Sequence, residues 1–101
     1  MATICATIVD ESGGKIGSSV VFSSKILPEH IDSRFMCVRF VDHYGDTVFN
    51  RLQMNALRQD LAVLRNERDD SNADMDVFDQ LEALIIRCHE EPHLYLKFIG
   101  D

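Results

Sequence analysis

The amino-acid sequence predicts an α+β domain with a four- to five-stranded, mostly antiparallel sheet and a C-terminal helical hairpin packed on one face. Three observations predict it. Segments of alternating apolar residues fill the first half of the 101-residue chain, two segments with helical periodicity follow, and one alternating segment comes last. Strands grouped before helices favour α+β over α/β. A chain of this length builds one core, so we expect a single domain over residues 1–101.

The first predicted hairpin lies in the N-terminal quarter of the chain. Residues 3–9 alternate, with Ile4, Ala6 and Ile8 on one face, which is typical of a strand. Two adjacent glycines then mark a turn, because glycine tolerates positive φ. Residues 18–27 form the second predicted strand, which ends before a proline.

The second predicted hairpin covers residues 34–54. Residues 34–42 place Met36, Val38 and Phe40 on one face and further apolar side chains on the other. Apolar residues on both faces indicate a central strand that is buried on both sides. A His-Tyr-Gly-Asp turn and a short extended segment complete this hairpin.

The first predicted helix covers residues 55–66. Leu57, Leu61 and Leu64 repeat at the spacing of one helix face, and the helix begins at an asparagine that is a possible N-cap.

A second helix and a last strand complete the predicted elements. An apolar stripe from Val77 to Cys88 predicts a helix that begins at an N-cap, Asp74, and runs through His89. Residues 93–99 alternate again, so we expect them to return to the sheet as its last strand.

The chain is acidic, and the excess charge is concentrated in one segment. Ten Lys and Arg against 17 Asp and Glu give a net charge of −7, which argues against nucleic acid and anionic membranes as partners. Residues 67–79 hold six carboxylates and one arginine, or −5 of that total. An acidic surface of this kind fits a basic protein partner. The residues expected to contact that partner are Asp69, Asp70, Asp74 and Asp76, with Tyr44 and Asp46 in the predicted turn.

The same acidic residues have a structural interpretation that needs no partner. A solvated loop, followed by aspartates that complement the dipole of the next helix, would account for them. Both interpretations stay open at the level of sequence.

Catalytic and cofactor motifs are not found in the sequence. There is neither a phosphate-binding glycine loop nor a nucleophile elbow. His89 and His93 are four residues apart beside Cys88, but Pro92 breaks the helix that would align them. We therefore expect no enzyme and no cofactor, and keep a small metal-dependent enzyme as a minor alternative.

The first seven residues lack the charged and apolar segments of a signal peptide, and the three cysteines are odd in number and widely spaced. These features predict a cytoplasmic protein with reduced thiols.

Two stretches resemble a group of small bacterial proteins that are associated with the immunity proteins of polymorphic toxin systems. They are FVDHYGDTVFNRLQ at residues 40–53 and YLKFIGD at residues 95–101. The resemblance implies a cytoplasmic protein that binds and silences a cognate toxin and has no active site of its own.

The sequence thus predicts a non-enzymatic acidic binding protein, in particular an immunity-type inhibitor of a basic toxin. The alternative is a homo-oligomeric structural or regulatory module, a possible homodimer, that associates through an exposed apolar face around Phe35 and Val41.

Overall fold

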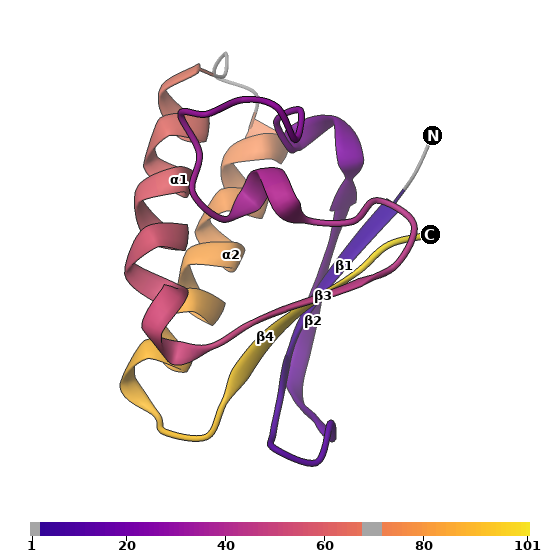
Figure 1. Cartoon of the computed structure of the whole chain (residues 1–101), viewed down its shortest axis with the longest axis vertical. Helices are drawn as coiled ribbons and strands as arrows, with labels where there is room; N and C mark the ends of the chain where they lie inside the picture. The colour runs from indigo at the N-terminus through magenta and orange to yellow at the C-terminus, as the bar shows by residue number, and fades with distance from the viewer. Residues whose placement is uncertain (1–2, 68–71) are drawn as a thin grey trace.

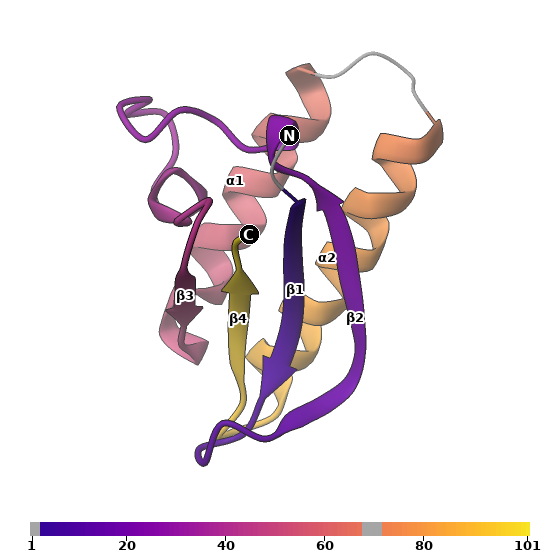
Figure 2. The same cartoon turned by 90° about the vertical axis from the view of Figure 1, so that its right-hand side faces the viewer.

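The computed structural model describes residues 3–67 and 72–101, which form one sheet and two helices (Figure 1). The sheet order is β2-β1-β4-β3, and all neighbouring strands are antiparallel. Both helices lie on the same face of the sheet, which confirms the predicted α+β architecture (Figures 1 and 2). The elements are β1 (Thr3–Val9), β2 (Lys15–Ser23), β3 (Asp46–Phe49), α1 (Met54–Glu67), α2 (Asn72–Glu90) and β4 (Tyr95–Ile99).

The core lies between the sheet and the helices. The predicted inward faces of the first and last strands are confirmed, since Ile4, Ala6, Ile8, Leu96 and Phe98 are all buried there. These side chains alternate with outward ones, so each strand contributes one apolar face to a core covered by helices on one side only.

The segment expected to be the central strand of the sheet, residues 34–42, is not a strand. It belongs to a long loop that contains a 3₁₀ turn at Val38–Phe40. The physical reason is its periodicity. Val38 is buried, whereas Met36 and Phe40, which a strand would place on the same face, are exposed. The other buried residues are Phe35, Cys37 and Val41, so burial does not follow the alternation of a strand. The apolar face expected around Phe35 and Val41 is therefore part of the core, and that predicted dimer surface is wrong.

Two further boundaries differ from the predicted ones. The second strand ends at Ser23, where a short 3₁₀ turn (Ser24–Ile26) replaces its last residues. Helix α2 begins at Asn72, so Asp74 lies inside the first turn and is not the N-cap. A carboxylate in the first turn still complements the helix dipole.

One buried carboxylate holds the long loop between β2 and β3, residues 24–45. Asp60 on α1 is 1% exposed. Its Oδ1 accepts the N–H of Met36 at 3.0 Å, and its Oδ2 accepts the N–H groups of Cys37 at 2.8 Å and Val38 at 3.0 Å. Charge-assisted bonds to several N–H groups compensate for burying the charge. The carboxylate therefore fixes the start of the 3₁₀ turn against α1.

All three cysteines are free, and two of them are buried. Burial raises the pKa of the Cys88 thiol to about 11, and burial followed by the nearby Asp60 carboxylate raises the pKa of Cys37. Neither thiol readily forms the reactive thiolate near neutral pH.

Within residues 3–67 and 72–101, neither helix is long and apolar enough to cross a membrane.

Replacing Asp60 tests the anchoring of the loop. Asp60→Ala leaves three N–H groups without an acceptor, two of them buried and one partly buried, so we expect it to lower the free energy of unfolding by about 3 kcal/mol. Asp60→Asn keeps one oxygen and turns an NH₂ group towards the remaining donors, so we expect a loss of about 1–2 kcal/mol. Denaturant unfolding measures both values, and a neutral Asp60→Ala would contradict the anchoring role.

The raised pKa of Cys88 predicts a loss of stability at alkaline pH. Above the ordinary thiol pKa of 9.0 the unfolded chain releases this proton, whereas the folded chain retains it up to about 11. The free energy of unfolding should therefore fall over this interval in the wild type. Unfolding curves of Cys88→Ala at the same pH values are the control, because that variant should lose this part of the pH dependence.

Candidate functional site

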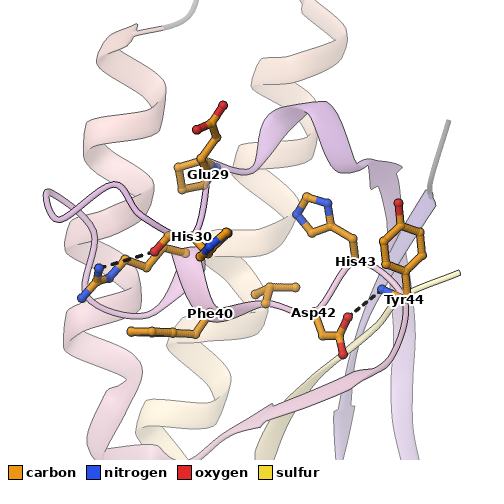
Figure 3. Close-up of a pocket in the computed structure, with 9 residues that line it drawn as sticks. Glu29, His30, Phe40, Asp42, His43 and Tyr44 are labelled. Carbon is orange, nitrogen blue, oxygen red and sulfur yellow. Dashed lines mark hydrogen bonds between the residues drawn. The ribbon is translucent and has the colours of Figure 1, made fainter.

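An open hollow of about 490 Å³ lies against the long loop between β2 and β3 (Figure 3). Two short segments of the loop line it, and the rings of His30 and His43 face the space between these segments. We call this site the loop hollow. Its lining residues are Pro28, Glu29, His30, Arg39, Phe40, Val41, Asp42, His43 and Tyr44.

Exposed apolar side chains are frequent on the long loop, and two of them line the loop hollow. These two are Phe40, which is 57% exposed, and Tyr44, which is 80% exposed; Ile31 and Met36 are exposed elsewhere on the same loop. These four are among the seven large hydrophobic residues that are exposed in the described part of the chain. Aromatic side chains that stay in water at the rim of a hollow are typical of a protein-binding surface.

Arg39 joins the two segments that line the loop hollow. Its guanidinium lies over the ring of Phe40, 4.5 Å from the centroid, and its Nη1 donates a hydrogen bond to the His30 carbonyl at 3.4 Å. The cation and the ring stabilise each other, so Phe40 is held in its exposed position.

The turn that carries His43 and Tyr44 is fixed from both sides. Asp42 accepts the Tyr44 N–H at 2.9 Å, as Figure 3 shows. From β4, the N–H of Gly100 donates to the Gly45 carbonyl at 2.8 Å and that of Asp101 donates to the His43 carbonyl at 3.0 Å. The backbones approach so closely that a Cβ on Gly100 would lie 2.4 Å from the His43 carbonyl carbon.

The structure does not bring the predicted partner-binding residues together. Asp74 and Asp76 lie at the N-terminal end of α2, whereas Tyr44 and Asp46 lie where the loop enters β3, on the opposite side of the molecule in Figure 2. Of these, only Tyr44 lines the loop hollow. The predicted contacts Asp69 and Asp70 lie outside the described residues.

The acidic segment is partly neutralised within the chain. Glu67 pairs with Arg34, and Asp79 pairs with Arg65 at 2.9 Å. For Asp74 and Asp76 the described residues provide no ion pair; Asp76 is exposed and Asp74 is half-buried.

Asp46 is also paired, since its carboxylate lies 3.4 Å from the Lys97 amine. Its predicted role as a contact would require a partner to compete with that lysine.

The metal alternative depended on His89 and His93, which the structure separates. His89 lies in the last turn of α2, where its carbonyl accepts a hydrogen bond from Arg51 at 2.9 Å. The ring of His93 pairs with Glu11 of the hairpin turn. In the part of the chain that the structure describes, no three His, Cys, Asp or Glu side chains are placed to share a metal ion.

Sequence reasoning missed most of the loop hollow. Glu29 and His30 lie between the two predicted hairpins, where no element is expected, and Arg39 and Phe40 lie in the segment predicted to be a central strand. Residues 35–41 are apolar at every position except Arg39, so this stretch alone does not distinguish a loop from a strand. The signal that was available is Asp60, a lone aspartate on the apolar face of the first predicted helix.

The close approach of β4 to the turn predicts the effect of Gly100→Ala. The added methyl group would collide with backbone atoms of Asp42 and His43, which cannot move without breaking the turn. We expect a loss of about 2 kcal/mol in the free energy of unfolding. We also expect weaker protection of the Asp101 amide in hydrogen exchange, because this N–H donates to the His43 carbonyl of the same turn. Gly13→Ala is a useful comparison, because that glycine has open space around it and only its positive φ of 87° opposes the change.

The chain was compared with protein-family models, with curated proteins and with solved structures, and none of these comparisons found a match.

Proposed function

We propose that this chain is a non-enzymatic binding protein of the immunity type, which inhibits a basic toxin by docking on it through the loop hollow. One observation carries the proposal: Phe40 and Tyr44 are exposed aromatic residues on a loop whose backbone is held by hydrogen bonds. Asp60 of α1 accepts some of these bonds, and the backbone that follows β4 donates the others. Exposed aromatic residues are typical anchors of protein–protein contacts.

The fixed backbone favours tight binding. Asp60 holds the loop on α1, and Gly100 holds the turn on β4, so little conformational freedom is lost when a partner docks. A hollow that exists before binding can receive a side chain of the partner without rearrangement.

The charge supports a basic partner. The loop hollow carries the carboxylates of Glu29 and Asp42 against the single guanidinium of Arg39, and the whole chain has a net charge of −7. An arginine or lysine of the partner could lay its aliphatic stem on an aromatic ring and direct its cationic end to a carboxylate. Asp74 and Asp76 lie away from the hollow and would act at long range, by increasing the rate of encounter.

Inhibition then follows from occupation of the partner's surface. A toxin that acts on an anionic substrate needs a basic surface to hold it. An acidic protein bound to that surface blocks access to the substrate and needs no catalytic group of its own.

The direct test uses the protein encoded by the gene adjacent to that of this chain. We expect its expression in a bacterial host to stop growth, and co-expression of this chain to restore growth. Phe40→Ala and Tyr44→Ala should each weaken the complex by at least tenfold, because each removes an exposed anchor. Leu52→Ala is the matched control, since Leu52 is exposed but does not line the loop hollow. Equal rescue by all three variants would contradict docking at this site.

A second measurement separates steering from docking. Asp74→Lys should lower the association rate several-fold and make it less dependent on salt, with little change in the dissociation rate. Glu90→Lys is the control, because it changes the net charge by the same amount at the other end of α2. If the N-terminal end of α2 faces the approaching partner, Glu90→Lys should lower the association rate less than Asp74→Lys. Identical kinetics for both variants would show that net charge alone matters.

A further inference from the structure

The outer face of the sheet is a second surface with no covering layer in the described residues. Figure 2 looks directly onto it, with the helices behind the strands. Side chains of paired residues lie on the same face. The register therefore assigns six apolar residues to what we call the outer face: Cys5, Val9, Val21, Val48, Tyr95 and Ile99.

The composition of the outer face is unusual for a sheet exposed to water. An antiparallel sheet covered on one side normally directs polar residues outwards. Here Val21 is 60% exposed and Val48 is 51% exposed on the two edge strands, and half-buried Tyr95 and Ile99 lie between them. Thr7 points outwards at the centre, yet its hydroxyl is buried and has no hydrogen-bond partner. The surface resembles one layer of a core.

The charge of the outer face distinguishes it from the rest of the molecule. Its strands carry Lys15 and Lys97 against Asp46, and Asp46 is paired with Lys97. The face is thus close to neutral on a chain with a net charge of −7. A basic partner is attracted to carboxylates elsewhere, whereas a second copy of this chain meets the least like-charge repulsion here.

We propose that the outer face is the contact between two copies of this chain, which pack sheet on sheet about a two-fold axis. Contacts of this kind are self-complementary and close after two copies. A recess of about 270 Å³ offers space for a side chain that projects from the other copy, and Val21 is such a side chain. Val9, Val48 and Tyr95 form its apolar part, and Asp10, Glu11, Gly13 and Lys97 line the rest.

The size of the outer face sets the strength of the contact. Four strands spaced about 5 Å apart and about 17 Å long cover roughly 340 Å² on each copy, which is below the size of stable specific interfaces. The expected complex is therefore a weak, reversible dimer that forms only at hundreds of micromolar. The loop hollow and the outer face share no residue. A test of the dimer can therefore fail without contradicting the proposed function, and the reverse is also true.

Sedimentation velocity over about 5–500 μM tests the dimer, because weak contacts of this area associate in that range. We expect the average mass to rise towards twice that of the chain. Val21→Glu and Val48→Glu should remain monomeric at least tenfold higher in concentration. Ile31→Glu places the same charge on an exposed side chain of the long loop and should behave as wild type. A wild type that stays monomeric throughout, or an Ile31→Glu variant that alone prevents association, overturns the proposal.

Two further readouts use the wild-type chain and need no variant. Salt should strengthen the dimer, because it screens repulsion between two acidic chains. Alkylation of Cys5 should slow several-fold as the concentration rises, because the contact covers this thiol, while buried Cys37 and Cys88 serve as slow internal references. A Cys5 rate that does not depend on concentration, or self-association that disappears in salt, rules out this face.

Discussion

The carboxylate of Asp60 is the interaction on which the candidate site depends. A loop of this length has few ways to satisfy its backbone donors once it is pressed against a helix. Asp60 on α1 accepts hydrogen bonds from three consecutive N–H groups of the loop. Because these donors are satisfied, the loop can pack against the helix and bury Phe35, Val38 and Val41 in the core. The side chains that alternate with them, including Phe40, are directed to solvent as a result. The exposure of the aromatic rim is thus a consequence of how the loop is buried.

The sequence predicted the regular part of the fold and not the irregular part, for a physical reason. The stripe of Leu57, Leu61 and Leu64 and the alternation of β1 and β4 are local patterns, each produced by one element packing on one core. The loop is determined by a contact between Asp60 and residues more than 20 positions away, which no local pattern encodes. A lone aspartate within an apolar helix face was nevertheless a visible sign of a buried polar contact.

The binding site, like the loop, could be predicted only where local sequence determines it. Tyr44 was found because a turn between extended segments exposes its residues, which local sequence can show. The acidic residues of α2 were grouped with it on charge alone, and charge carries no information about position in space. Only the three-dimensional structure shows that the N-terminal end of α2 and the loop lie towards opposite edges of the sheet (Figure 2).

The sheet order has a consequence for the synthesis of this protein. Strand β4 lies between β1 and β3, although nearly the whole chain separates it from β1 in sequence. A chain still emerging from the ribosome therefore holds β1 and β2 as a bare hairpin and β3 with no neighbour. When residues 95–101 pair with β1 and β3, they complete the sheet and also form the hydrogen bonds that hold the turn beside the loop hollow. The loop hollow is therefore available to a partner only after the last residues of the chain have folded.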